Sequence, residues 1–148
     1  MTPIDGADAI PDVEKDASGE TLAAVRSLGP GAPALAFDVG GTDIKSALFD
    51  ADGTALGLRR TPTPVVAGDR THAILDRLDA LAAELRDAHP EVVPQAVGLV
   101  VPGIVDADAG VGVFASNMGW RDAPLRDLAR ERLELMMLSA VILRLRIH

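Results

Sequence analysis

The chain has 148 residues, of which 48% are apolar, and this is enough to bury the core of one domain. Its net charge of −8 argues against nucleic acid as a partner, because phosphate backbones are bound by clustered lysines and arginines. Cysteine is absent, which excludes disulfides and thiolate metal sites. Residues 1–30 contain acids and no apolar signal segment, so the sequence predicts a cytoplasmic protein with no membrane partner.

Residues 1–33 are predicted to form a disordered acidic leader. They contain six acidic residues against two basic ones, show little hydrophobic periodicity and end in a run rich in Gly and Pro. Such a composition buries too little apolar surface to offset the entropy of ordering the chain. A globular lobe is therefore expected to begin at residue 34.

Three strands are predicted next, at 34–39, 44–49 and 55–61. The second and third are separated by Asp52-Gly53, a dipeptide typical of tight hairpins, and Pro62 ends the third. We expect these strands to pair in antiparallel order.

A helix is predicted over 69–88, with Asp69 as its N-cap and leucines at helical spacing facing the core. The near-continuous apolar run 95–101 is typical of a strand that is covered on both faces. A short strand at 111–115 follows, and Asp122 is the expected cap of a second helix with Pro124 in its first turn.

The first strand ends in Asp38-Val39-Gly40-Gly41-Thr42. Glycines at 40 and 41 would let the backbone bend through positive φ and bring its amides close to an anion. Thr42 adds a hydroxyl donor, and Asp38 can hold Mg²⁺ through water beside phosphates. Lys45 is expected to point either to the phosphates or to solvent. The alternative is an ordinary tight hairpin; P-loop and Rossmann sites are disfavoured because the glycines lie between two strands.

A second block reads Val101-Pro102-Gly103-Ile104-Val105-Asp106 and is followed by Ala115-Ser116-Asn117-Met118-Gly119-Trp120. With both blocks in this order and spacing, residues 34–133 closely resemble the amino-terminal lobe of a ROK-family sugar kinase of the bacterial glucokinase kind. The resemblance implies an α/β, ribonuclease-H-like (actin-like ATPase) lobe with a mixed sheet and flanking helices.

The resemblance also implies an activity and its site residues. The intact relative would transfer the γ-phosphate of ATP, with Mg²⁺, to a hexose such as glucose, and a homodimer is a family expectation. Asp38, Gly40, Gly41, Thr42 and Lys45 would bind the nucleotide and its metal. Gly103 and Asn117 would contact the sugar, although by itself Asn117 also fits a turn. The sequence leaves polyphosphate open as the donor.

Three further residues keep simpler expectations. Trp120 is expected to fill the core of the lobe rather than to stack on the sugar. Asp106 is expected to form a turn. Asp43 stands where many ROK sequences have a basic or amide residue. A carboxylate at this position would repel a bound triphosphate.

The resemblance breaks off in the atypical apolar and basic tail, 134–148. The family's general-base Asp lies beyond the matching region, so no catalytic residue is assigned, and the family's zinc motif and second lobe have no match. We interpret the break as the result of a frameshift or truncation. The tail itself could form an edge strand and is too short to cross a membrane. The chain by itself is then expected to be inactive. The alternatives are a non-catalytic sugar- or nucleotide-binding protein and a degraded gene product.

Overall fold

The computed structural model describes residues 14–15, 21–22, 30–133 and 140–144, with side chains from residue 30 to 133. A five-stranded mixed sheet has the order β10-β6-β3-β4-β5. It consists of β3 (Ala34–Val39), β4 (Asp43–Phe49), β5 (Ala55–Pro62), β6 (Ala96–Val101) and β10 (Ala140–Arg144). β4 is antiparallel to both of its neighbours, whereas β3, β6 and β10 run parallel. The predicted antiparallel pairing of the first three strands is confirmed, and the strand predicted at 95–101 is observed as β6.

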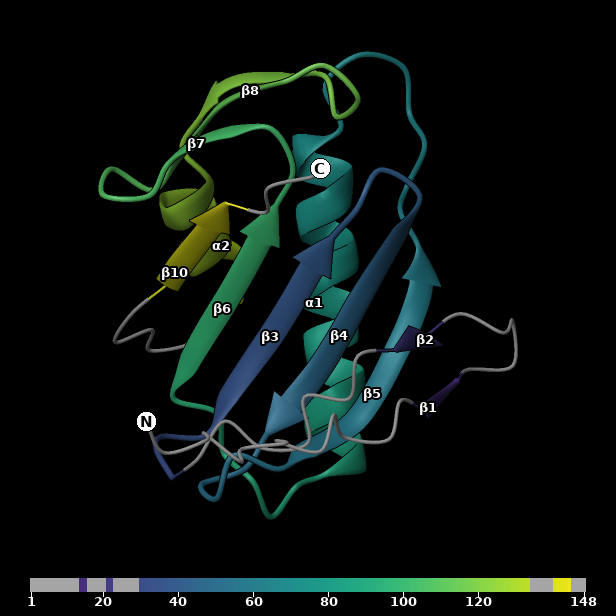
Figure 1. Cartoon of the computed structure of the whole chain (residues 1–148), viewed down its shortest axis with the longest axis vertical. Helices are drawn as coiled ribbons and strands as arrows, with labels where there is room; N and C mark the ends of the chain where they lie inside the picture. The colour runs from purple at the N-terminus through teal and green to yellow at the C-terminus, as the bar shows by residue number, and fades with distance from the viewer. Residues whose placement is uncertain (1–13, 16–20, 23–29, 134–139, 145–148) are drawn as a thin grey trace, which may run out of the picture.

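Two helices lie behind the sheet, α1 (Thr71–Ala88) and α2 (Leu125–Leu133) (Figure 1). The leucines of α1 pack on alternate residues of β3 and β6, which gives these strands one buried face and one half-exposed face. The expectation that β6 is covered on both faces is therefore not met by the described residues, because both helices lie on the same side of the sheet. The core consists chiefly of Leu35, Phe37, Val39, Leu75, Leu78, Leu81, Leu85, Val97, Leu99 and Trp120.

A smaller sheet of β7 (Ile104–Asp106), β8 (Val111–Ala115) and β9 (Trp120–Ala123) lies beyond the carboxyl ends of β3 and β6 (Figure 1). Trp120 is 1% exposed, which confirms its predicted place in the core. Asp106 accepts a hydrogen bond from the amide of Ala109, as a turn residue does. Asp122 lies within β9 at φ 49°, so the prediction that it caps α2 is wrong.

The connections follow local turn chemistry. In the β4–β5 hairpin, Asp50 accepts hydrogen bonds from the amides of Asp52 and Thr54, and Gly53 has φ 81°. Helix α1 begins at Thr71, two residues after the predicted start, so its N-cap is Arg70 and the prediction of Asp69 is wrong. The Asp69 carboxylate accepts a hydrogen bond from the Thr71 amide instead.

The predicted leader and tail are described only in part. β1 (Glu14–Lys15) and β2 (Thr21–Leu22) pair in antiparallel fashion. In the tail, β10 lies at the edge of the sheet over 140–144, so it shares only 143–144 with the alternating segment 143–147 from which an edge strand was expected. The rest of 134–148 lies outside the described residues. Neither helix in the described residues combines the length and apolar character that a membrane crossing requires.

We predict that Leu81→Ala lowers the free energy of unfolding by about 2–5 kcal/mol, because it leaves a cavity between α1 and the sheet. Leu58→Ala on β5, where the side chain is 48% exposed, should cost less than about 1 kcal/mol. Urea unfolding of the two variants measures both values. Equal losses would contradict the assignment of the α1 leucines to the core.

Candidate functional site

The loop between β3 and β4 is closed by its own turn and held by Thr63, which directly follows β5. The amide of Gly40 donates to the carbonyl of Asp43 at 2.8 Å. Thr63, which is 3% exposed, donates its amide to the Thr42 carbonyl and its hydroxyl to the Gly40 carbonyl, at 2.8 and 2.7 Å. The loop carbonyls are thus bonded within the fold, while Thr42 remains exposed at the apex.

The predicted positive φ of Gly40 and Gly41 is not observed: neither residue is in the left-handed region. Both glycines are explained by close approach instead. A Cβ on Gly40 would lie 2.9 Å from the Asp43 carbonyl oxygen, and one on Gly41 would lie 2.9 Å from Asn117 Nδ2. A side chain at Gly40 would therefore collide with the loop's own backbone, whereas one at Gly41 would have to displace the Asn117 side chain.

Asp38 and Lys45 lie on the face of the sheet that turns away from α1. They are direct cross-strand partners, and Arg60 on β5 is the next partner of Lys45. Directly paired residues share a face, so the three side chains form one row. Neither Asp38 nor Lys45 has a side-chain hydrogen bond or ion pair with any described residue. Both are available to a ligand at the end of β3.

The acid at Asp43 is neutralised within the fold. Arg60 Nη2 lies 2.8 Å from Asp43 Oδ2, and Nε of the same guanidinium donates to that oxygen at 3.0 Å. The two side chains are 24% and 28% exposed, so they are partly shielded from solvent. This pairing reduces the repulsion that the sequence led us to expect between Asp43 and bound phosphates.

The structure brings the second predicted block to the first. Asn117 is exposed in the turn between β8 and β9, where the amides of Met118 and Gly119 donate to the Ala115 carbonyl. Met118 is fully buried and anchors this turn. Asn117 Nδ2 lies against Gly41, so one residue of the predicted sugar loop contacts the predicted phosphate loop.

Gly103 is held by packing on β8. Its φ is 94°, and a Cβ there would lie 2.2 Å from the Phe114 carbonyl oxygen. The fold therefore requires glycine at this position for its own packing. A contact between Gly103 and a sugar stays a prediction.

Arg70, which the sequence analysis missed, joins the segments around the site. Its Nε donates to the Pro64 carbonyl at 2.7 Å, its Nη1 to the Asn117 carbonyl at 3.0 Å and its Nη2 to the Gly41 carbonyl at 3.4 Å. One signal could have identified it. An arginine at a helix amino terminus is unfavourable beside the helix dipole, so its presence there indicates another role.

The donor set fits a magnesium nucleotide. No group of three His, Cys, Asp or Glu side chains that could hold a metal is found among the described residues. A single carboxylate such as Asp38 is nevertheless compatible with Mg²⁺, which keeps several waters and is bound largely by substrate phosphates. The Thr42 hydroxyl at the loop apex and the Lys45 ammonium are hydrogen-bond donors of the kind that phosphates accept.

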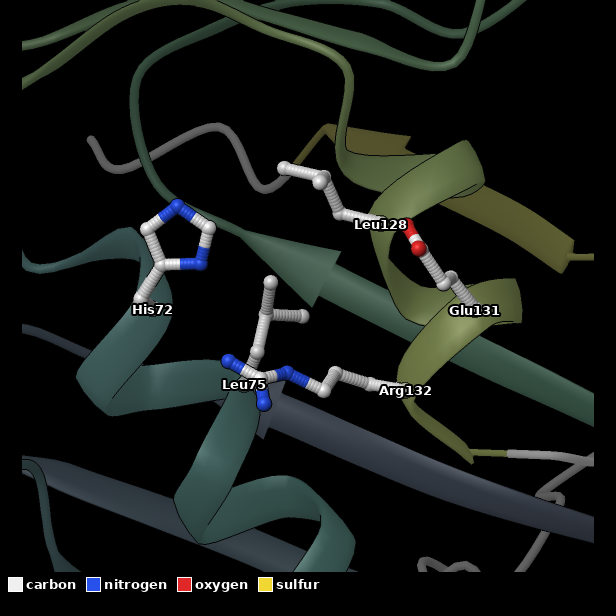
Figure 2. Close-up of a pocket in the computed structure, with 5 residues that line it drawn as sticks. All are labelled: His72, Leu75, Leu128, Glu131 and Arg132. Carbon is white, nitrogen blue, oxygen red and sulfur yellow. The ribbon is translucent and has the colours of Figure 1, made fainter.

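A pocket of about 350 Å³ lies elsewhere, between α1 and α2. Figure 2 shows His72 and Leu75 on α1 facing Leu128, Glu131 and Arg132 on α2. Arg132 pairs with Asp76 of α1 at 2.9 Å, which ties the two helices together across this groove. No predicted site residue lines it, so the candidate site stays where the β3–β4 loop meets Asn117.

Comparison with known proteins identifies the family. Residues 34–139 match the sequence profile of the ROK family. The chain belongs to the ROK family. It is 32% identical over 101 residues to a glucokinase of Streptomyces coelicolor and 33% identical over 103 residues to one of Halalkalibacterium halodurans. It covers 30% and 31% of these relatives' lengths and 68% of its own in both cases.

Solved ROK structures share the fold. A ROK hexokinase from Thermus thermophilus superposes with a TM-score of 0.62 at 26% identity, over 76% of this chain and 35% of that one. A ROK glucokinase from Streptomyces griseus in complex with glucose and AMPPNP gives 0.61 at 29% identity, over 74% and 32%. The predicted actin-like ATPase fold is confirmed.

We predict that Gly41→Ala displaces the Asn117 side chain, because the added methyl group would lie within 2.9 Å of its amide nitrogen. The Asn117 side-chain amide signals should shift in nitrogen–proton NMR spectra, with little loss of stability. Gly31→Ala is the matched control, since nothing lies within 4 Å of a Cβ there. Unchanged Asn117 signals in Gly41→Ala would show that the two loops do not touch.

Proposed function

We propose that this chain supplies the phosphate-binding and sugar-binding loops of an ATP-dependent hexose kinase, with glucose as the favoured sugar. The contact between Asn117 and Gly41 carries the proposal, because an amide suited to sugar hydroxyls lies beside a glycine loop suited to phosphates. The comparison proteins support it: several are glucokinases, and one was solved with glucose and AMPPNP. The chain covers about a third of their length, so the activity is that of the whole enzyme.

Each residue has a role that its position supports. The Asn117 amide would donate to one sugar hydroxyl and accept from another. The Gly41–Thr42 apex and the Lys45 ammonium would bind the terminal phosphates, and Asp38 would hold water on Mg²⁺. Bound Mg²⁺ would supply charge neutralisation for phosphoryl transfer. Such a nucleotide substrate agrees with the cytoplasmic location that the sequence predicts.

The 148-residue chain by itself is proposed to bind without phosphorylating. The general base that the resemblance implies follows the residues that match the family's motifs. Loss of a base alone lowers a rate by about 10²–10⁴-fold. A binding protein without catalytic activity remains the alternative, and assays of glucose phosphorylation with this chain should show no turnover under either proposal.

We predict that Asn117→Ala weakens glucose binding by about tenfold, because it removes hydrogen bonds to sugar hydroxyls. Asp38→Ala should instead weaken binding of AMPPNP with Mg²⁺ and leave glucose affinity within about twofold. Isothermal titration calorimetry of each variant with each ligand measures the four affinities. N-acetylmannosamine and polyphosphate are titrated for comparison, because the chain is also similar to an N-acetylmannosamine kinase and to a polyphosphate/ATP-glucomannokinase.

Ser116→Ala is the control for Asn117→Ala, since it alters the neighbouring exposed residue of the same turn. If glucose affinity falls equally in both variants, the loss reflects the turn and not the Asn117 amide. If the unmodified chain binds neither glucose nor AMPPNP, its proposed role in binding is wrong.

We also predict that Asp43→Asn strengthens AMPPNP binding by about threefold, because it removes a negative charge near the phosphate loop. Arg60→Ala should have the opposite effect, since it leaves the Asp43 carboxylate without its partner. The two effects should shrink as salt rises. Affinities measured at low and high salt check both signs, and salt-independent changes would indicate a rearranged loop instead.

A further inference from the structure

The guanidinium of Arg70 is a junction between three loops. Its hydrogen bonds reach Pro64 in the β5–α1 connection, Asn117 in the β8–β9 turn and Gly41 in the β3–β4 loop. The backbone amide of Arg70 also donates to the Met118 carbonyl, at 3.2 Å. One residue therefore contacts both halves of the candidate site and the connection that lies beside them.

The bonded atoms are all backbone carbonyls. Arg70 therefore fixes the course of each loop and leaves the Asn117 side chain and the Thr42 hydroxyl available. The same segments also pack closely without Arg70's side chain, because a Cβ on Gly119 would lie 2.3 Å from the Gly68 carbonyl oxygen. The turn that carries Asn117 thus has a close backbone neighbour, and Arg70 adds the link from that turn to Gly41.

We propose that Arg70 is a positioning residue, which sets the distance between the sugar loop at Asn117 and the phosphate loop at Gly41. This inference rests on the function proposed above. In a kinase the sugar hydroxyl and the γ-phosphate must meet within a narrow range, and a misplacement of about 1 Å can cost about 100-fold in rate. A residue that bonds both loops directly is suited to control that distance.

The planar fork of arginine is required for this role. Its five N–H donors point in fixed directions, so one side chain can bond three carbonyls at once. Lysine has one compact ammonium on a flexible stem and cannot span the same acceptors. Arg70→Lys therefore keeps the positive charge and loses the three hydrogen bonds, so it separates the effect of the charge from that of loop positioning.

The test uses glucose as the probe, because it is neutral and a change in local charge should barely affect its affinity. We expect Arg70→Ala and Arg70→Lys each to weaken glucose binding by about tenfold in calorimetry. The matched control is Arg126→Ala, since Arg126 likewise bonds two backbone carbonyls, those of Ala107 and Asp108, in a turn outside the site. That variant should lose comparable stability and keep its glucose affinity.

A second readout follows the loops directly. In nitrogen–proton NMR spectra, Arg70→Lys should shift the amide signals of Thr42 and Met118, which follow the carbonyls that Arg70 bonds. Free guanidinium at a non-denaturing concentration should partly restore the glucose affinity of Arg70→Ala, which a general loss of stability would not permit.

The outcomes separate this inference from the proposed function. If the unmodified chain binds glucose and Arg70→Lys binds it equally well, the positioning role is overturned and the proposed function stands. If Arg126→Ala loses as much glucose affinity as Arg70→Ala, the effect is one of stability, and the inference is again wrong. If the unmodified chain binds neither glucose nor AMPPNP, the proposed function fails and the positioning role fails with it.

Discussion

Burial of alternate residues of β3 beneath α1 decides where the polar residues of this lobe can lie. Leu35, Phe37 and Val39 are almost fully buried, so the strand's period of two places Asp38 on the opposite face. Antiparallel pairing then sets Lys45 beside Asp38. A slip of one residue would move both charged groups into the core, at a cost that far exceeds a typical single contact. The strand register that buries the apolar residues of β3 therefore also places Asp38 and Lys45 on the opposite face of the sheet.

Close packing at the carboxyl ends of the strands then brings distant segments together. The β3–β4 loop is braced by Thr63, and the β8–β9 turn is held by the buried side chain of Met118. The Asn117 side chain fills the space beside Gly41. Two motifs about 75 residues apart in the chain therefore lie side by side, and Arg70 links their backbones through hydrogen bonds.

The sequence predicted the parts of this structure that depend on local pattern. The strands at 34–39 and 111–115 match the observed β3 and β8, because hydrophobic alternation and nearby turn residues determine them. The sequence analysis did not predict β7 and β9, because these strands are too short to show hydrophobic alternation and form through pairing with β8. The site residues were found through motifs, whereas Arg70 and the Arg60–Asp43 pair depend on contacts between segments that no local pattern encodes.

The electrostatics of the site differ from those of the whole chain, which carries a net charge of −8. Lys45 has no ion-pair partner among the described residues, and the described partners of Arg70 are neutral carbonyls. The charge of Arg70 is therefore not cancelled where its guanidinium approaches Gly41. Coulomb interactions between exposed groups are screened over about 8 Å at physiological ionic strength, so nearby charges outweigh distant ones. The loop is therefore governed by a mixed set of charges, in which Lys45 and Arg70 lie near Asp38 and the Arg60–Asp43 pair, and Arg70 contributes both a cation and the contacts that hold the loop.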